Sequence, residues 1–483
     1  MGNRTKNTPL GATVWSFVER LSTQIVSFAI GIILARLLSP HDYGVVGMIA
    51  IFIALSNVFI DSGFANALIH KQDRNDSDLS TAFYFNIAVG IFVYSILWVC
   101  APFIADFFNE AVLVNIVRIS GLTIVFYSLS IVQTAILTAT LNIRLQTIIN
   151  LSSQVPAGIV AIYFAKSGYG VYSLALQTVI AAALRCFLLF LIARWLPNEK
   201  FNLTSFRYLW NYGSKLLAAS LIGATFDQIY SVLIGRYVGI AELGYYAKAE
   251  NLKNNVTGIT NGIIQKVALP VLSAYQNDTK LLCEKFRDMM KSLVMFIAPL
   301  SAFLFFSAKD IVVVLWTDKW LYSSELFQLL IIGAMFTPIG YTSLALIQAV
   351  GRTSTILKLE FPKKAIYIIL IALGFCYGVK GLCIAQIFIC ITAAIMNMFP
   401  TKKILGYSYI EQALDLVRYM VIAFLSYLLA SFFSVFSNLF LCIITKFFIG
   451  TAFYMGMLYI IKDSIFIYTL KNIIKNINNR INK

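Results

Sequence analysis

The chain has 483 residues, of which 59% are hydrophobic and only 12% charged, and its mean hydropathy is +0.80. A soluble globular protein carries about twice that share of charged residues, so the composition excludes a soluble globular fold. The formal charge of +16 does not indicate a nucleic-acid partner, because the basic residues lie in short segments between apolar runs, where Lys and Arg fix the orientation of membrane helices.

Apolar runs of roughly 20 residues, the length that crosses a bilayer as a helix, recur from one end of the chain to the other. They predict an all-α polytopic membrane protein with about 14 transmembrane helices. The predicted spans are residues 12–37, 42–66, 81–106, 111–138, 147–166, 169–193, 213–237, 242–268, 289–308, 325–349, 357–378, 379–400, 415–436 and 437–461. The polar segment 1–10 is too short for a cleaved signal peptide, so the first span is expected to stay in the mature protein.

The distribution of positive charge predicts the orientation of the chain. An even number of spans puts both termini on one side, and 26 of the 38 Lys and Arg residues are assigned to that side, in its loops, in its tails and in the adjoining parts of the spans. The opposite side holds only eight, several of them at helix ends. Because cytoplasmic loops are enriched in Lys and Arg, we expect a multi-pass protein of the cell inner (cytoplasmic) membrane with both termini in the cytoplasm.

The turn between the first two predicted spans has a counterpart 200 residues later, where Arg36 matches Arg236 and Gly44 matches Gly244. One interpretation is that hairpin turns between membrane helices simply share this outline. The other is an internal duplication, with six spans in each half and a pseudo-two-fold axis along the membrane normal. The duplication predicts an N-terminal lobe at 1–200, a C-terminal lobe at 201–405, two further helices at 406–461 and a basic amphipathic cytoplasmic tail at 462–483. The tail is expected to lie on the anionic cytoplasmic leaflet, with docking to a protein partner as the alternative.

Ionisable residues inside a bilayer are costly, so each one within a predicted span is a candidate cavity residue. The basic candidates for substrate binding are Arg20, Arg185, Lys248 and Lys253, and the acidic candidates for the cavity or for coupling are Glu19, Asp61, Asp227 and Glu250. Several of them have alternatives that need no cavity. Glu250 and Lys253 are spaced i,i+3 and can neutralise each other. Arg185 can reach the cytoplasmic headgroups, and Asp61 can cap a helix or pair with a loop lysine.

A set of short motifs follows the chain in a fixed order. They are ARLLSPHDYG at 35–44, DSGF at 61–64, APFIADFF at 101–108, LGYY at 243–246, LPVLS at 269–273, WTDKW at 316–320 and AVGR at 349–352. Together they resemble the polysaccharide-export flippases of the MOP superfamily, the Wzx/WzxC-like carriers of lipid-linked oligosaccharide. The resemblance covers most of the chain up to about residue 400.

The resemblance implies a twelve-helix core in two lobes around a central cavity, with two peripheral helices. It implies a substrate made of undecaprenyl-pyrophosphate-linked oligosaccharide repeat units, which move by alternating access to the outer leaflet for O-antigen, capsule or exopolysaccharide biosynthesis. Membrane lipids are expected to contact the chain, and a polysaccharide polymerase and a chain-length regulator are the protein partners that such a pathway implies. Of the basic candidates, Arg20 is expected to contact the pyrophosphate.

Two other functions stay open at this stage. A cation-coupled drug or metabolite exporter of the same superfamily would favour an acidic cavity, whereas the intramembrane set has four acids and four bases. A membrane enzyme of polysaccharide assembly would need catalytic residues, and the two histidines, His41 and His70, fall in separate turns on opposite sides of the membrane. The seven cysteines contain no CxxC pair and the chain has no Walker A loop. We therefore expect no catalytic, metal or cofactor site.

Overall fold

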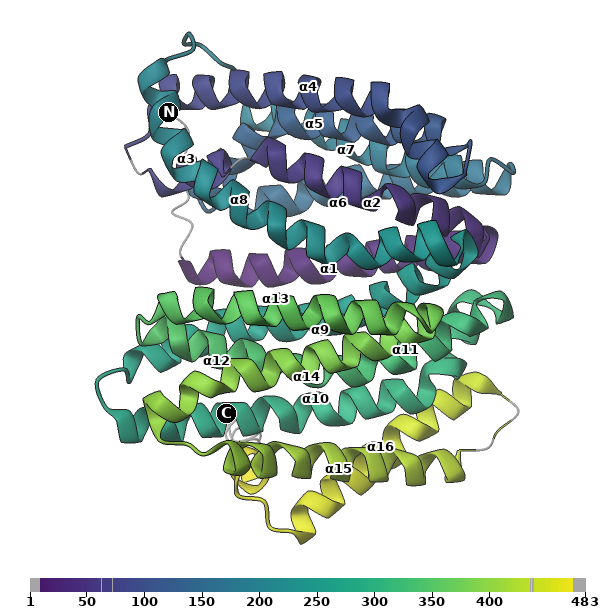
Figure 1. The fold of residues 1–483 in the computed structure, drawn as a ribbon, viewed down its shortest axis with the longest axis vertical. Helices are drawn as coiled ribbons and strands as arrows, with labels where there is room; N and C mark the ends of the chain where they lie inside the picture. Colours follow the sequence, from purple (N-terminus) through teal and green to yellow (C-terminus); the bar gives the residue numbers. More distant parts are fainter. Residues whose placement is uncertain (1–8, 62, 72, 435, 437, 472–483) are drawn as a thin grey trace, which may run out of the picture. The chain divides into compact units, whose positions relative to one another are not determined.

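The structure is a computed structural model that describes residues 9–61, 63–71, 73–434, 436 and 438–471. The regular structure of this part is entirely helical (Figure 1), because a segment in lipid must satisfy its backbone hydrogen bonds internally. The elements are α1 (Pro9–Leu37), α2 (Pro40–Asp61), α3 (Phe64–His70), α4 (Asp76–Phe108), α5 (Leu113–Ala139), α6 (Ile143–Lys166), α7 (Val171–Ala193), α8 (Leu203–Leu233), η1 (Ile234–Val238), α9 (Ile240–Ala274), α10 (Thr279–Trp316), η2 (Asp318–Trp320), α11 (Leu321–Ala334), α12 (Thr337–Ala349), α13 (Thr353–Phe375), α14 (Gly378–Leu405), α15 (Tyr409–Phe433) and α16 (Leu439–Ile460).

The predicted fold class, an all-α polytopic membrane protein, is confirmed. Within the described residues, 12 stretches are long and apolar enough to cross a membrane. Each predicted span coincides with one helix or with two consecutive helices. The two spans outside the 12 are α9 and α13, each of which carries several charged residues. The predicted number of 14 transmembrane helices therefore requires that α9 and α13 also cross the membrane, and it stays a prediction.

The chain divides into two compact units, which we call unit 1 (1–247) and unit 2 (248–483). In unit 1, α5 packs against α4 and α7, α6 packs against α1 and α7, and α8 packs against α2 (Figure 1). In unit 2, α14 packs against α11, α12 and α13, while α10 packs against α11, α15 and α16. These two units are defined by the contacts within each of them, and such a division does not test for repeated sets of helices. The predicted boundaries after residues 200, 405 and 461 therefore stay predictions.

Two of the predicted spans are each built from two α-helices, and a third, at 213–237, is α8 followed by the π-helix η1. The span predicted at 325–349 is α11 followed by α12, and Pro338 stands in the first turn of α12, where its missing N–H costs nothing. The span predicted at 42–66 is α2 followed by α3, with Gly63 between them at a φ of 70°. Pro156 and Pro299, in contrast, lie inside the continuous helices α6 and α10.

The starts of α2 and α9 touch through two glycines that are 200 positions apart. A side chain on Gly44 would overlap the carbonyl group of Ile240, and one on Gly244 would overlap the carbonyl group of Pro40. The contacts are reciprocal, because Ile240 also follows Pro40 by 200 positions. A two-fold relation between two copies of a turn produces such a self-complementary contact. The contact thus supports the interpretation of this turn as duplicated, while superposition of the two halves stays a prediction.

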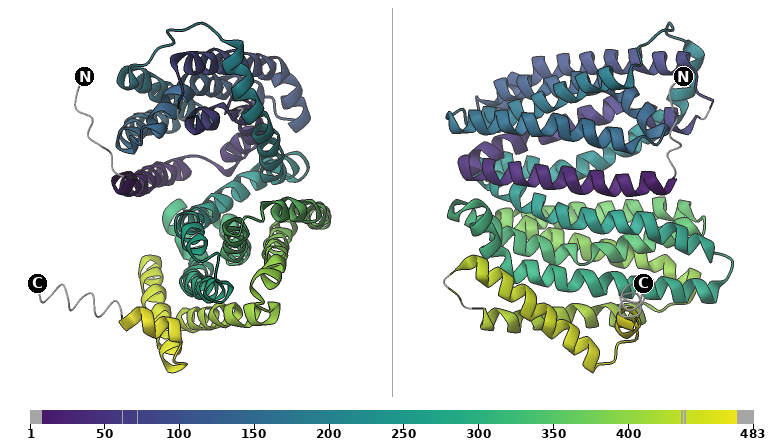
Figure 2. Two further views of the ribbon diagram at one scale, coloured as in Figure 1. Left: turned by 90° about the vertical axis from the view of Figure 1, so that its left-hand side faces the viewer. Right: turned by 180° about the vertical axis from the view of Figure 1, so that it is seen from behind.

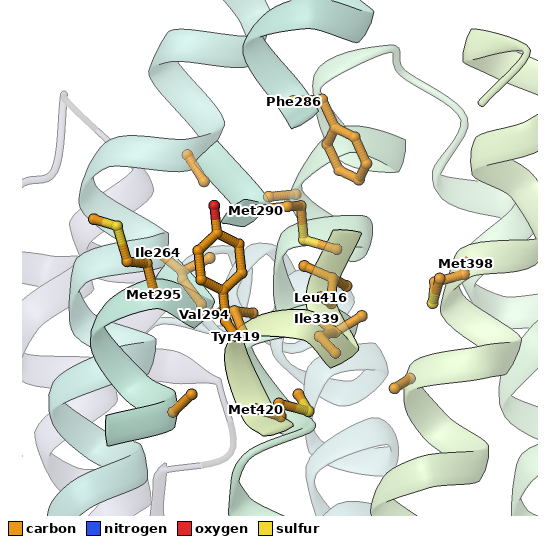
Figure 3. Close-up of a cluster of buried hydrophobic side chains, with 14 of the residues drawn as sticks. Ile264, Phe286, Met290, Val294, Met295, Ile339, Met398, Leu416, Tyr419 and Met420 are labelled. Carbon is orange, nitrogen blue, oxygen red and sulfur yellow. The ribbon is translucent and has the colours of Figure 1, made fainter. Parts of the chain in front are cut away.

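Unit 2 has a core of buried apolar side chains that α9, α10, α12, α14, α15 and α16 contribute. Figure 3 shows Met290 and Val294 of α10 close to Tyr419 of α15 in this core. Tyr419 and Phe286 are 0% exposed. Because lipid tails are as apolar as these side chains, dense packing and polar contacts hold membrane helices together more than transfer from water does.

Ion pairs fasten α15 and α16 to α10, and Figure 2 shows these two helices beside it. Asp415 of α15 lies 2.6 Å from Nε of Arg287 and 2.9 Å from Nζ of Lys291, both on α10. Lys446 of α16 lies 2.6 Å from Asp310 of α10. These basic residues therefore join helices of unit 2, in addition to any part that their charge plays in membrane orientation.

The beginning of the predicted cytoplasmic tail is anchored to unit 2. Asp463 is 3% exposed, forms an ion pair with Arg418 and accepts a hydrogen bond from the Tyr419 hydroxyl at 2.9 Å. Its other carboxylate oxygen accepts from the backbone N–H of Phe466 at 3.0 Å, so it caps the helix that follows. Phe466 of the predicted amphipathic tail packs against the core of unit 2. The part of the tail after residue 471 lies outside the described residues.

Candidate substrate and coupling site

A partly buried polar network joins four helices of unit 1. Nδ2 of Asn150 on α6 donates a hydrogen bond to Oε1 of Glu19 on α1 at 2.9 Å. A guanidinium nitrogen of Arg185 on α7 donates to Oγ1 of Thr134 on α5 at 3.5 Å. Glu19 and Arg185 also interact electrostatically. The structure therefore brings two of the predicted candidates, one acid and one base, into the same network.

Arg185 retains hydrogen-bonding capacity inside this network. Its Nε is buried and has no hydrogen-bond partner among the described residues. Its contact with Thr134, at 3.5 Å, is at the long limit for a hydrogen bond. A guanidinium group presents its donors in a planar fork that matches phosphate and carboxylate. Arg185 therefore has the chemistry of an anion ligand.

Asp61 lies on a polar cavity of unit 1. The cavity has a volume of about 240 Å³, and its lining includes Asn57 and Asp61 of α2, Asn66 of α3 and Tyr127 of α5. Tyr127 interacts electrostatically with both Asp61 and Arg185, so this cavity is adjacent to the polar network. Oδ1 of Asp61 is buried and has no hydrogen-bond partner among the described residues.

The alternative pairing of Asp61 with a loop lysine is not observed among the described side chains. The lysine of the following loop, Lys71, lies 2.7 Å from Asp78 instead. The hydrogen bond from Lys71 to Asp78 raises the pKa of the Lys71 ammonium group. Asp78 also completes a capping box with Asn75 at the start of α4. Lys71 thus fixes the connection between α3 and α4.

Arg20 and Asp227 occupy exposed positions on α1 and α8. Glu19 is partly buried and turned to α6, whereas Arg20, the next residue, is exposed. This difference follows from the rotation of roughly 100° between successive residues of a helix. Arg20 and Glu19 therefore act on different faces of α1, as their spacing predicts.

The candidates of unit 2 are each held by a neighbour. Lys248 is 8% exposed, and its Nζ lies 5.0 Å from the ring centre of Trp316 and 5.6 Å from that of Trp320. Both rings belong to the WTDKW motif and provide cation–π contacts. Nζ of Lys253 lies 3.5 Å from Glu250, which is the i,i+3 pair expected from the sequence. An anionic ligand would have to compete with these partners for either lysine.

The neutral members of these sites were not predicted. Asn150, Thr134 and Tyr127 carry no charge at neutral pH, and the cost of burying charge does not identify them. The cost of burying an amide would have identified Asn150, and it also identifies Asn86 on α4 and Gln133 on α5. Both of these are 0% exposed, and neither amide has a hydrogen-bond partner among the described residues.

The chain is similar to known proteins of polysaccharide biosynthesis. A family profile described as "Polysaccharide biosynthesis protein" matches residues 33–325. The succinoglycan biosynthesis transport protein ExoT of Rhizobium meliloti (strain 1021) is 22% identical over 85% of this chain and 82% of its own length. The lipopolysaccharide biosynthesis protein WzxC of Escherichia coli (strain K12) is 23% identical over 80% of this chain and 79% of its own.

The fold is similar to that of the lipid II flippase MurJ in an inward closed conformation. The two structures superpose with a TM-score of 0.73 at 17% sequence identity, over 93% of this chain and 98% of the other. The resemblance to polysaccharide-export flippases that the motifs indicated is confirmed. Since the family profile covers more than half of the chain, this multi-pass membrane protein belongs to the polysaccharide biosynthesis protein family.

Proposed function

We propose that the protein is a flippase that carries undecaprenyl-pyrophosphate-linked oligosaccharide repeat units across the inner membrane for the biosynthesis of a surface polysaccharide. Family membership supports a role in polysaccharide biosynthesis, and two relatives are named as biosynthesis or transport proteins for succinoglycan and lipopolysaccharide. The fold that it shares with a lipid II flippase supports movement of a lipid-linked substrate by alternating access. The protein moves its substrate without changing it chemically.

The observation that carries this proposal is the polar network of Glu19, Asn150, Thr134 and Arg185 within an apolar helical unit. A membrane protein retains such costly groups where a polar ligand has to cross. The pyrophosphate of the substrate is anionic, and it needs fixed positive charge in exchange for its hydration. Charge attraction is several-fold stronger in a protein interior than in water.

The basic residues have distinct roles in this proposal. Arg20 is the first contact for the pyrophosphate, because it is exposed next to Glu19 of the network. Arg185 receives the anion further in through its unused Nε. Lys248 binds the anion only after it leaves the rings of Trp316 and Trp320. Lys253 binds it only after its ion pair with Glu250 breaks. Glu19, Asp61, Asp227 and Glu250 are the acids that balance these charges or take part in coupling.

The proposed orientation places both termini in the cytoplasm, so the substrate enters from the cytoplasmic leaflet. The proposed protein partners are a polysaccharide polymerase and a chain-length regulator, which act on the repeat unit after its transfer. His41 contacts Glu110 at 3.7 Å and is 52% exposed, which suits a surface ion pair better than catalysis. A cation-coupled drug exporter of the same fold is the competing function.

Reconstitution of the purified protein separates the two functions. Vesicles would contain a short-chain polyprenyl pyrophosphate with a fluorescent oligosaccharide, and a membrane-impermeant quencher would report which leaflet holds it. We expect the wild type to equilibrate this lipid between leaflets, and Arg185→Gln to slow it by about tenfold or more because a charged hydrogen bond is lost. Thr134→Val is the matched control, since it removes the 3.5 Å contact of Arg185 and the hydrogen bond from the Thr134 hydroxyl to the carbonyl of Ser130, while the guanidinium group stays in place. Transport of a cationic dye in place of the lipid would contradict the proposal.

A further inference from the structure

The junction between α2 and α3 interrupts a membrane segment inside unit 1. α2 ends at Asp61 and α3 begins at Phe64. Gly63 has a φ of 70°, a conformation that glycine adopts without strain. A Cβ atom on Gly63 would lie 2.6 Å from the Cα of Gly213 on α8, so the two backbones are in close contact. The interruption is therefore fixed by packing against α8.

The lining of this cavity is rich in oxygen atoms. Among the described residues, its polar members are Asn57, Asp61, Asn66, Tyr127 and Ser220. They supply a carboxylate, two amide carbonyls and two hydroxyl groups. In transporters, the carboxyl-terminal ends of interrupted helices are places where coordinating oxygens meet.

The two basic residues of the loop after α3 are engaged elsewhere and do not pair with the carboxylate of this cavity. Lys71 is engaged by Asp78 at 2.7 Å. Arg74 donates to the backbone carbonyl groups of Leu68 and Lys71 at 3.3 Å and 3.2 Å. Oδ1 of Asp61 accepts no hydrogen bond from any described group. A buried carboxylate oxygen without a hydrogen-bond partner is costly, and a bound cation would remove that cost.

We propose that this cavity binds one alkali metal cation, Na⁺ being the test ligand, with Asp61 as the charged ligand and neutral oxygens around it. A single carboxylate matches a single positive charge. Calcium sites usually carry several carboxylates, and the described residues contain no group of three or more His, Cys, Asp or Glu that could hold a metal ion. A cation in this position joins α2, α3, α5 and α8 through one ligand set. Its use as a coupling ion rests on the proposed transport function, whereas its binding rests on the cavity alone.

The test measures binding to the purified full chain and not transport. The unfolding midpoint would be followed as Na⁺ replaces choline at constant ionic strength, and bound ²²Na⁺ would be counted on the same samples. We expect a saturable rise of the midpoint in the wild type. Asp61→Asn should weaken Na⁺ binding by about tenfold or more, because a full charge is replaced by a dipole. Asn66→Ala, at an exposed position of the lining, should weaken it less and tests the site without altering the buried acid.

The control is Asp76→Asn, which removes an exposed acid at the start of the neighbouring helix α4. It should bind Na⁺ as the wild type does. Equal Na⁺ responses in the wild type and in both cavity variants would overturn the proposal, as would a midpoint that responds to pH but to no alkali cation. Because binding is measured without substrate, failure of this test leaves the proposed transport standing. Failure of the reconstituted transport assay likewise leaves the cation site standing.

Discussion

The ion pair between Lys446 of α16 and Asp310 of α10 gives the sharpest prediction about stability. The two side chains are 12% and 13% exposed, and their charged atoms are 2.6 Å apart. Lys446 also donates to the backbone carbonyl of Phe306 at 3.2 Å. Asp310 has Lys446 as its ion-pair partner among the described residues. The two single substitutions should therefore differ in cost.

Lys446→Met should be the more destabilising change, by about 3–4 kcal/mol, because it leaves the Asp310 carboxylate buried without its partner. Asp310→Asn should cost about 1–2 kcal/mol, since Lys446 keeps the carbonyl of Phe306 and an amide oxygen replaces the carboxylate. The double variant Asp310→Leu with Lys446→Met should come close to the wild type, because a buried ion pair and an apolar pair of similar size differ little in stability. Comparison of the single variants Asp310→Leu and Lys446→Met with this double variant measures the coupling free energy between the two positions.

Unfolding of the purified variants in a denaturing detergent series would measure these free energies, with abundance in the membrane fraction as a second readout. The matched control is Lys380→Met, because Lys380 forms a pair of nearly the same length, 2.7 Å, with Glu325, but the two side chains are 54% and 50% exposed. This control should change stability little, since water already solvates both groups. Equal effects of Lys446→Met and Lys380→Met would refute the argument that burial sets the cost.

Further predictions concern the ligand, the topology and two contacts. Arg20→Ala should abolish export of surface polysaccharide at normal protein abundance, and Arg20→Lys should keep part of it because the charge remains while the planar fork is lost; reduced abundance would instead assign Arg20 a structural role. A cysteine at Lys200 should react with an impermeant thiol reagent only after cells are opened, and labelling of intact cells would refute the predicted topology. Gly244→Val should destabilise the protein by roughly 1–3 kcal/mol through overlap with Pro40, and an unchanged unfolding midpoint would contradict that contact. Asp463→Ala should lower the free energy of unfolding by about 1–2 kcal/mol and expose the tail to proteases, because a helix cap and the partner of Arg418 are lost. A rate of proteolytic cleavage equal to that of the wild type would argue against this anchor.

The helices of this fold could be predicted from the sequence because bilayer thickness and backbone satisfaction leave one main solution for each long apolar run. The break between α11 and α12 has a local sign in Pro338. The break between α2 and α3 was missed, because Gly63 alone does not distinguish a bend from a helix end. What fixes that break is the approach of Gly213, which is distant in the sequence. Interruptions set by tertiary contact leave no pattern in the segment itself.

Of the residues that form the candidate site, only the charged ones could be predicted from the sequence. Glu19 and Arg185 were selected individually by the cost of burying charge, and the structure places them in one network. Their hydrogen-bond partners Asn150 and Thr134 could not be assigned, since pairing across 131 and 51 positions depends on how helices pack. The cation–π contacts of Lys248 could not be predicted for the same reason, although its partner rings belong to the WTDKW motif at 316–320.

The reciprocal contact at the starts of α2 and α9 places unequal demands on the residues that form it. Gly44 and Gly244 each meet a backbone carbonyl group, and every amino acid supplies one, so the partner position accepts Pro40 in one copy and Ile240 in the other. The glycine position tolerates no side chain in either copy. After a duplication, the position that contributes the carbonyl group can therefore change its side chain in either half. The position that packs against this carbonyl group has to remain glycine in both halves. The predicted duplication would account for proline and isoleucine at one position of this chain and for glycine twice at the other.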